Sequence, residues 1–302
     1  MSAQRIAIAG GSGQLGTALR AVFADREIVA PSHAELDFED TAALGRLLDR
    51  TQPAVLINCT AFHHVDTCER EPERAFAVNA LAVDRAAALC ARRGVAFATV
   101  SSDYVFDGAL GRAYREDDAV NPLTAYGASK AAGEFLTRRH GERHYIVRTS
   151  GVFGTTGTSS KGYTLIEKVL RQAERGEPTR MVDDMVFSPS YAPHVARALR
   201  DLIDREAYGT HHVVNAGATS WFDFVHAAFE KAGLGSAPLE RTSYAALGNP
   251  TRRPMCSPLA NTTFARTGIG ALPHWSAALD EFLAARTAGV TGHPLGAGKH
   301  PA

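Results

Sequence analysis

Cysteine is scarce in this sequence. Only 4 of the 302 residues are cysteines, and no two of them form a Cys-X-X-Cys pair. They are Cys59, Cys68, Cys90 and Cys256. This pattern excludes a small, disulfide-dense secreted fold. We therefore expect four reduced thiols in a cytoplasmic protein.

Neither sign of charge prevails, and no long apolar run is present. Lys and Arg together number 32, as do Asp and Glu, so the formal net charge is zero. The chain thus lacks the concentrated basic face that a general nucleic-acid or membrane-surface binder needs. No apolar run reaches the ~18 residues of a membrane span, and residues 1–5 show no signal-peptide pattern. Nucleic acid and membrane are therefore not expected partners.

The chain does have a regular alternation of apolar runs and amphipathic stretches. Its apolar content of 45% suffices for a large core. Strand-like runs lie at Arg5–Ala9, Glu27–Ala30, Ala54–Asn58, Val95–Val100 and Tyr145–Val147. Helical patterns separate them at Gln14–Ala24, Thr41–Arg50, Glu73–Arg93 and Ala125–Arg139. This order predicts an α/β fold with a Rossmann-type, doubly wound parallel sheet covered on both faces.

The alternation loosens after residue 150. Gly151–Gly162 is rich in Gly, Ser and Thr, which is typical of a loop near a ligand. Further elements are expected at Thr164–Arg175, Ala192–Asp204, His211–Asn215, Ser220–Lys231 and Trp275–Ala285. We assign residues 1–150 to the Rossmann core and 151–287 mainly to a smaller C-terminal lobe for substrate, with elements that return to the core. Residues 288–302 are expected to be a disordered tail.

Three glycines follow the first predicted strand and open the first predicted helix: Gly10, Gly13 and Gly16. A sharp turn there brings the backbone close to a pyrophosphate, which the helix N-terminus attracts. A tight turn with no ligand is the alternative, but the position in the chain favours a dinucleotide. Residues 30–33 (APSH) carry neither the acidic nor the basic residue that separates NAD from NADP. Asp37 follows slightly later, where we expect it beside the adenine.

Tyr126 and Lys130 form a Tyr-X-X-X-Lys pattern in a helical stretch, so both project from one helix face. An ammonium near a phenol lowers the pKa of the phenol, which can then exchange a proton with a carbonyl or alcohol oxygen. Ser102 closes the fourth predicted strand, at the edge where α/β sheets bind ligands. Its hydroxyl there can orient a substrate oxygen. A chance Tyr/Lys pair is the alternative, but the order Gly loop, Ser, Tyr, Lys favours an active site.

This order resembles that of the short-chain dehydrogenase/reductase superfamily, extended branch. Within that branch, the chain is similar to the dTDP-4-dehydrorhamnose reductase family. The resemblance covers about residues 5–285. It rests on 13–16 (GQLG), 102–108 (SDYVFDG, with Ser in place of the family's Thr), 121–130 (NPLTAYGASK), 148–150 (RTS), 221–223 (WFD) and 253–254 (RP).

The resemblance implies reduction of the C4 ketone of a nucleotide-linked 6-deoxysugar with NADPH or NADH, the last step in making dTDP-L-rhamnose. It implies Tyr126 as proton donor, Lys130 as its partner and Ser102 as the substrate-orienting hydroxyl. Cofactor contacts are expected from Gly10, Gly13, Gln14, Leu15, Gly16, Asp37, Phe38, Ala61, Phe62 and His63, besides Tyr126 and Lys130. Substrate contacts are expected from Ser102, Asp103, Tyr126 and Arg253. A second copy of the chain, in a homodimer, is a further expected partner.

Other functions within the same fold remain to be weighed. Nucleotide-sugar dehydratases place an Asp–Glu pair after the strand hydroxyl, whereas here Asp103 is followed by Tyr104, so one carboxylate for eliminating water is missing. A nucleotide-sugar 4-epimerase uses the same Ser, Tyr and Lys and stays open. A non-catalytic subunit, similar to the relative that regulates methionine adenosyltransferase, also stays open, although the intact catalytic set weighs against it.

Three further positions carry weaker signals. His63 and His64 are adjacent on an extended segment and point to opposite sides, so we expect no metal site and place His63 beside the cofactor. Asn79 lies on an otherwise apolar helix face, which favours a buried amide that ties strands to a helix. Arg253 suits a substrate diphosphate, and a solvated loop arginine is the alternative.

Gly151 departs from the family pattern. After residues 148–150 the family usually has a Trp that contacts the sugar. The missing indole removes an aromatic wall of the pocket. Either the pocket admits a different or larger sugar, or another aromatic such as Phe153 or Tyr163 replaces the Trp from a shifted position. We favour the first and expect a preferred sugar other than the usual rhamnose precursor.

Overall fold

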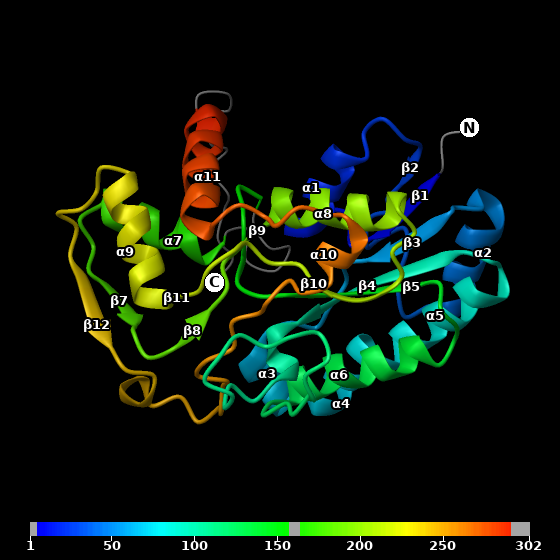
Figure 1. The fold of residues 1–302 in the computed structure, drawn as a ribbon, viewed down its shortest axis with the longest axis horizontal. Coiled ribbons are helices and arrows are strands. Elements are labelled where there is room, and N and C mark those ends of the chain that lie inside the picture. Colours follow the sequence, from blue (N-terminus) through cyan, green and yellow to red (C-terminus); the bar gives the residue numbers. More distant parts are fainter. Residues whose placement is uncertain (1–4, 157–163, 291–302) are drawn as a thin grey trace.

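The computed structural model describes residues 5–156 and 164–290. Its centre is a six-stranded sheet of order β10-β5-β4-β3-β1-β2, in which every pairing is parallel (Figure 1). The strands are β1 (Ile6–Ala9), β2 (Ile28–Val29), β3 (Val55–Asn58), β4 (Ala96–Ser102), β5 (His144–Thr149) and β10 (Gly209–His212). The chain passes from β1 to β2 on one side and then to β3 on the other. The predicted doubly wound α/β fold is therefore confirmed, with its switch point between β1 and β3.

Helices cover both faces of this sheet because its strands are apolar on both sides. Ile6 and Ile8 of β1 pack in a cluster with α1 and α8, whereas Ala7 and Ala9 pack in another with α2 and α5. Figure 1 shows α1 and α8 on one side of the sheet, and α2, α5 and α6 on the other. These helices are α1 (Gln14–Val22), α2 (Thr41–Thr51), α5 (Ala82–Arg92), α6 (Ala125–Arg138) and α8 (Ala192–Asp204).

The helix predicted over Glu73–Arg93 is not continuous. It consists of α4 (Pro72–Phe76), a π-helical turn (Ala77–Leu81) and α5, and the short α3 (Val65–Arg70) precedes it. A π-helical turn inside an α-helix often marks a functional site. Within the described part of the chain, no helix has the length and apolar character needed to cross a bilayer.

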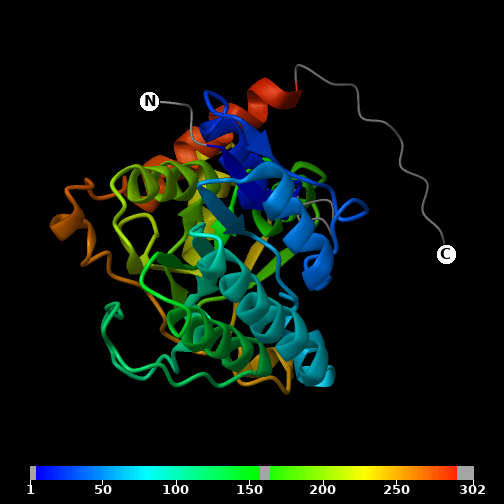
Figure 2. The same ribbon diagram turned by 90° about the vertical axis from the view of Figure 1, so that its right-hand side faces the viewer.

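A second, smaller lobe stands beside the sheet in Figure 1 and lies behind it in the turned view of Figure 2. Its apolar cluster includes Phe153, Phe224 and Phe282. Its helices are α7 (Leu165–Glu174), α9 (Trp221–Lys231) and α11 (Trp275–Val290). Its strands are β7 (Thr179–Val182), β8 (Val186–Phe187), β11 (Thr219–Ser220) and β12 (Leu239–Thr242), and β6 (Val152–Phe153) pairs with β9 (Ser190–Tyr191) near the junction.

Several elements beyond residue 150 belong to the sheet layer. Strand β10 extends the sheet, α8 covers it, and Phe264 of α10 (Phe264–Thr267) joins the same core cluster. We propose to keep residue 150 as the boundary, with these as the returning elements. Of the tail predicted at 288–302, the helix α11 includes the part up to Val290, and residues 291–302 lie outside the described residues.

A buried ion pair fastens α6 to the sheet. Arg148 of β5 donates from Nε to Glu134 Oε1 at 2.8 Å and from Nη2 to Oε2 at 2.7 Å. The two side chains are only 2% and 1% exposed, and Ser101 of β4 donates to the same carboxylate at 2.6 Å. Burial alone would raise the pKa of Glu134, but the hydrogen bonds and charge of Arg148, together with the hydrogen bond from Ser101 and the charge of Arg138, outweigh it and hold that pKa below its ordinary value. One carboxylate thus joins α6 to two strands.

Replacing this carboxylate is expected to destabilise the fold strongly. Glu134→Ala leaves the Arg148 guanidinium buried without its partner, which costs ~3–5 kcal/mol of unfolding free energy. Urea denaturation followed by circular dichroism measures the loss. The matched control is Glu177→Ala, which removes the partner of Arg175 from a surface pair of 2.6 Å with both side chains about half exposed, and little change is expected. Equal losses in both variants would contradict the anchoring role of Glu134.

Candidate active site

The turn from β1 into α1 requires glycine at two positions, one in the loop and one in the first turn of the helix. Gly10 has φ +76°, and a Cβ there would lie 3.1 Å from the backbone of Cys59. A Cβ on Gly16 would overlap the carbonyl oxygen of Gly10. Because Gly13 is the N-cap of α1, the first N–H groups of the helix have no partner within it. The loop therefore forms a cradle of backbone donors suited to a phosphate.

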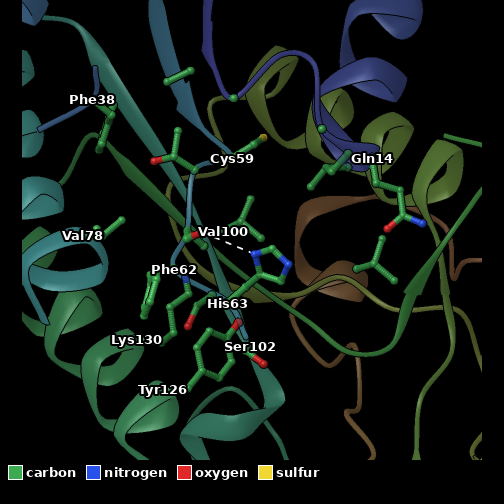
Figure 3. A pocket seen from close by; sticks show the side chains of 18 of the residues that line it. Gln14, Phe38, Cys59, Phe62, His63, Val78, Val100, Ser102, Tyr126 and Lys130 are labelled. Carbon is green, nitrogen blue, oxygen red and sulfur yellow. Dashed lines mark hydrogen bonds between the residues drawn. The ribbon is translucent and has the colours of Figure 1, made fainter. Parts of the chain in front are cut away.

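A cavity of about 910 Å³ lies along the carboxyl ends of β1, β3 and β4 (Figure 3). The predicted site residues that line it are Gly10, Gly13, Gln14, Leu15, Asp37, Phe38, Ala61, Phe62, His63, Ser102, Asp103, Tyr126 and Lys130. Gly16 is buried behind the loop, and Arg253 is not part of the lining. The structure thus brings the glycine loop and the Ser, Tyr and Lys residues to one space of the size typical for ligand sites.

An ion pair that the sequence did not predict lies in the cavity lining near Phe38. Arg74 of α4 and Glu39 both line the cavity and form an ion pair at 2.6 Å. No motif marks either residue, since they meet only when α4 packs near the segment around Asp37. An arginine in this place gives the outer end of the cavity a cation already held by a carboxylate.

The start of α6 places Tyr126 and Lys130. Thr124 caps the helix, since its Oγ1 accepts a hydrogen bond from the N–H of Gly127 at 2.9 Å. A Cβ on Gly127 would overlap the carbonyl oxygen of Tyr104, so only glycine lets the helix lie this close to the turn after β4. The Tyr104 ring meets the Tyr126 ring edge-on at 5.7 Å. Tyr126 and Lys130 consequently point into the cavity beside Ser102 (Figure 3).

Burial dominates the electrostatics of this pair. It raises the pKa of Tyr126 above its ordinary value, and a hydrogen bond with Ser102 opposes the rise. It lowers the pKa of Lys130 to about 8, against the attraction of Glu134. The expectation that the pKa of the tyrosine lies below its ordinary value is therefore not met in this structure, because desolvation of the phenolate is the largest influence on it. Tyr126 keeps its proton at neutral pH, as a proton donor should.

Ser102 is held by its neighbours at the end of β4. Its Oγ accepts from the N–H of Tyr104 at 3.2 Å and donates to Asp103 Oδ1 at 3.0 Å. The other oxygen of Asp103 accepts from Ser257 at 2.6 Å, and burial raises the pKa of this carboxyl. Asp103 thus connects the cavity serine to the C-terminal segment. Its predicted contact with substrate stays a prediction.

Asn79, in the π-helical turn, connects the cavity wall to α6. Its side chain pairs with both backbone groups of Phe62 at 2.9 Å and donates to Ser129 Oγ at 3.0 Å. A Cβ on Gly133 would overlap the carbonyl oxygen of Asn79, so α6 lies directly against the turn. This is the amide tie expected from the sequence, although its partner is the segment after β3 rather than a strand.

Arg253 lies at the edge of the site. Its Nη2 pairs with Asp66 of α3 at 2.8 Å, and its Nη1 lies 3.4 Å from the hydroxyl of Tyr104. Tyr104 itself lines the cavity. Tyr104 therefore lies between the guanidinium and the cavity that holds Ser102 and Tyr126. The ion pair with Asp66 fixes the guanidinium, so Arg253 is not a solvated loop cation.

The two adjacent histidines contact different neighbours. His63 lines the cavity, with Nδ1 3.5 Å from the carbonyl oxygen of Ala61 (dashed in Figure 3), whereas His64 Nδ1 meets Thr67 Oγ1 at 3.0 Å. Within residues 5–156 and 164–290, no group of three or more His, Cys, Asp or Glu side chains is placed to hold a metal ion.

Gly151 lies against the ring of Phe187. Gly151 lines the cavity with φ +48°, and a Cβ on it would overlap the ring of Phe187. Phe153, one of the expected replacements, is buried in the core of the smaller lobe, and Tyr163 lies outside the described residues. The expectation of an opened pocket at this position stays a prediction. A ring from β8, which is not part of the cavity lining, lies where a Cβ on residue 151 would be.

Comparison with known proteins identifies the family. The family model described as RmlD substrate binding domain matches residues 4–288. The chain belongs to this family, that of the dTDP-4-dehydrorhamnose reductases. The dTDP-4-dehydrorhamnose reductase of Mycobacterium tuberculosis is 35% identical over 289 residues, 93% of each chain. The spore coat polysaccharide biosynthesis protein SpsK of Bacillus subtilis is 34% identical over 285 residues, which cover 94% of this chain and 98% of SpsK.

A solved structure supports the same assignment. The dTDP-4-dehydrorhamnose reductase of Bacillus anthracis, described in complex with NADP, superposes with a TM-score of 0.89 at 28% identity. The match covers 94% of this chain and all of that one. The resemblance drawn from the sequence motifs is thereby confirmed at the level of family and fold.

Removing the Tyr126 hydroxyl tests its role. Tyr126→Phe keeps the ring but not the proton, so we expect turnover to fall ~10²-fold or more while cofactor affinity changes little. Steady-state kinetics and a cofactor titration by fluorescence measure the two. Tyr104→Phe is the control, since that ring packs against Tyr126. Near-normal turnover of Tyr126→Phe would rule out this residue as proton donor.

Burial of Lys130 is expected to cost stability. The folded pKa of about 8 lies below the unfolded 10.5, so below pH 8 the fold must bury a charge that the unfolded chain leaves in water. Lys130→Met should therefore be more stable than wild type at pH 7, by up to about 3 kcal/mol, and inactive. The advantage should shrink between pH 8 and 10.5, where wild type loses the proton.

Denaturant unfolding at a series of pH values measures this difference. Lys168→Met, which alters an exposed lysine of α7, is the control and should bring no comparable gain at pH 7. A Lys130→Met variant less stable than wild type at pH 7 would show that the ammonium is compensated inside the fold.

Proposed function

We propose that this protein reduces the 4-keto group of a nucleotide-linked deoxysugar with NADPH or NADH. The observation that carries the proposal is the meeting of Ser102, Tyr126 and Lys130 with the glycine loop in one cavity, in a chain that belongs to the dTDP-4-dehydrorhamnose reductase family. We propose for this chain the substrate class that the relatives' name states.

The residues present fit a dinucleotide. A Cβ at Gly10 would press on the backbone of Cys59 and one at Gly16 would overlap Gly10, so both glycines keep the turn at the start of α1 tight, and the free N–H groups there suit a pyrophosphate. Gln14 and Leu15 border this end, and Phe38 and Asp37, which line the same cavity, would hold the adenine side. The segment Ala61–His63 would face the nicotinamide half. When bound, the reduced nicotinamide supplies the hydride that the ketone carbon accepts.

Tyr126 is the proposed source of the proton. As the ketone carbon is reduced, negative charge develops on its oxygen, and a neutral tyrosine hydroxyl can donate its proton there. Ser102 Oγ orients the same oxygen. Lys130, with a pKa of about 8, is protonated at neutral pH, and its charge favours the tyrosinate that remains. Tyr126 regains its proton from solvent before the next turnover.

The test is an assay of the purified protein with a dTDP-4-keto-6-deoxysugar and either NADPH or NADH. We expect loss of nicotinamide absorbance in a one-to-one ratio with the keto sugar. A changed sugar configuration without net nicotinamide consumption would instead indicate a 4-epimerase. No reaction, together with binding to a methionine adenosyltransferase, would indicate the regulatory alternative.

Arg253 is the proposed ligand of the substrate diphosphate. Its guanidinium is held by Asp66 and lies beside the Tyr104 hydroxyl that borders the cavity. Burial would lower the pKa of Arg253, but the nearby Tyr104 and Asp66 outweigh it. The cation is therefore permanent, and an arginine fork matches the geometry of a phosphate.

Loss of this arginine should weaken substrate binding. Arg253→Ala removes a contact made both before and during the reaction, so KM should rise by about 10-fold or more while kcat changes little. Arg252→Ala, next in sequence and exposed, is the matched control and should leave KM unchanged. Indistinguishable KM values for the two variants would remove Arg253 from the substrate site.

We also propose a cellular location and an oligomeric state for this protein. All four cysteines are free thiols, which supports a cytoplasmic location.

Three large apolar side chains are exposed on elements that pack together: Phe76 of α4, Leu81 of the π-helical turn and Phe135 of α6. They are 38%, 50% and 58% exposed. Such exposed apolar side chains support a homodimer through this face. Light scattering would measure the mass in solution.

A further inference from the structure

Gly151 puts bare backbone at the substrate end of the cavity. Ser102 of β4 pairs in register with Thr149 of β5, and Gly151 follows two residues later, where it lines the same cavity as Ser102 and Tyr126. Its φ of +48° is one that side-chain-bearing residues rarely adopt. A side chain at position 151, just after β5, would therefore be strained, and the wall here is backbone.

The ring of Phe187 lies directly behind this backbone. It is the group that a Cβ on Gly151 would overlap, through two of its ring carbons. Phe187 belongs to β8 and is 4% exposed. The cavity lining at this point is Gly151 itself, and the ring of Phe187, which is not part of the lining, backs it from the smaller lobe.

Phe187 is clamped in place. The indole of Trp221 is stacked on it with centroids 3.8 Å apart and an interplanar angle of 13°, and Phe224 meets it edge-on at 5.9 Å. Residue 187 also pairs with Thr219 between β8 and β11. A ring held on its face and its edge cannot swing away when a ligand presses on Gly151.

We propose that Phe187, held by Trp221, sets the size limit of the sugar subsite from behind Gly151, and so selects the substituent next to the reacting ketone. This inference rests on the proposed function. A flat, rigid, apolar wall accepts a small apolar substituent such as a methyl group and resists a longer one. Because the ring comes from another element, the limit is relaxed by shortening Phe187 and not by changing Gly151.

The experiment compares two substrates in three proteins. The substrates are a dTDP-4-keto-6-deoxyhexose and its homologue with one more carbon at the C5 substituent. The ratio of kcat/KM for the homologue to that for the parent sugar is measured for wild type, Phe187→Leu and Phe224→Leu. Phe224 is the matched control, because it lies in the same aromatic cluster and touches both Phe187 and Trp221 but is not the ring that Gly151 meets.

We expect Phe187→Leu to raise this ratio by about 10-fold, the usual worth of one methylene in an apolar pocket, and Phe224→Leu to leave it at the wild-type value. Phe187→Met, which retains most of the volume in a flexible side chain, should shift the ratio in the same direction if the leucine variant does not fold. Thermal melting of each variant identifies one that has lost the fold.

An unchanged ratio in a folded Phe187 variant would overturn the inference, as would an equal shift in Phe224→Leu. Gly151→Ala with wild-type stability and activity would also overturn it, since the ring could not then occupy the place described. A wild-type protein that reduces neither sugar contradicts the proposed function itself, whereas an active wild type with an unmoved ratio contradicts only the role of Phe187.

Discussion

The buried pair of Arg148 and Glu134 is the interaction on which the active site depends. Both side chains are almost fully buried, and replacing such a pair with apolar residues is often neutral or even stabilising, so stability alone does not account for it. Its position does. Glu134 lies one helical turn after Lys130 on α6, and its charge opposes the loss of the Lys130 proton that burial promotes. One carboxylate therefore both fastens the helix and keeps its lysine charged.

Next to this ion pair, α6 lies so close to neighbouring backbone that two of its positions have no room for a side chain. Gly127 lies on the carbonyl oxygen of Tyr104, and Gly133 on that of Asn79. The π-helical turn brings the amide of Asn79 to both backbone groups of Phe62. The residues that border the nicotinamide side of the proposed site and the helix that carries the proposed proton donor are thus parts of one rigid unit. Such preorganisation is what fixes a donor relative to a reacting atom.

The sequence was informative where function depends on local pattern. The glycine loop, the Tyr126–Lys130 spacing and the strand-end Ser102 are each readable from a few neighbouring residues, and the alternation of elements gave the sheet on which they meet. It was silent on the Arg74–Glu39 and Arg253–Asp66 pairs, because these partners meet only through the packing of α4, α3 and the C-terminal segment. The direction of the Tyr126 pKa was also beyond reach, since it depends on burial that no motif encodes.

Position 151 shows why a single departure from a family pattern is hard to interpret. A missing indole in one strand suggests a wider pocket only if nothing else can enter the space. Here the backbone has a positive φ, which glycine adopts with the least strain, and the ring of Phe187 from a strand of the other lobe lies where a Cβ would be. The small residue at position 151 and the large ring at position 187 lie 36 residues apart in the sequence. The loss at Gly151 and the placement of Phe187 therefore have to be considered as one structural feature, because a glycine without the ring would leave a void and a ring without the glycine would clash.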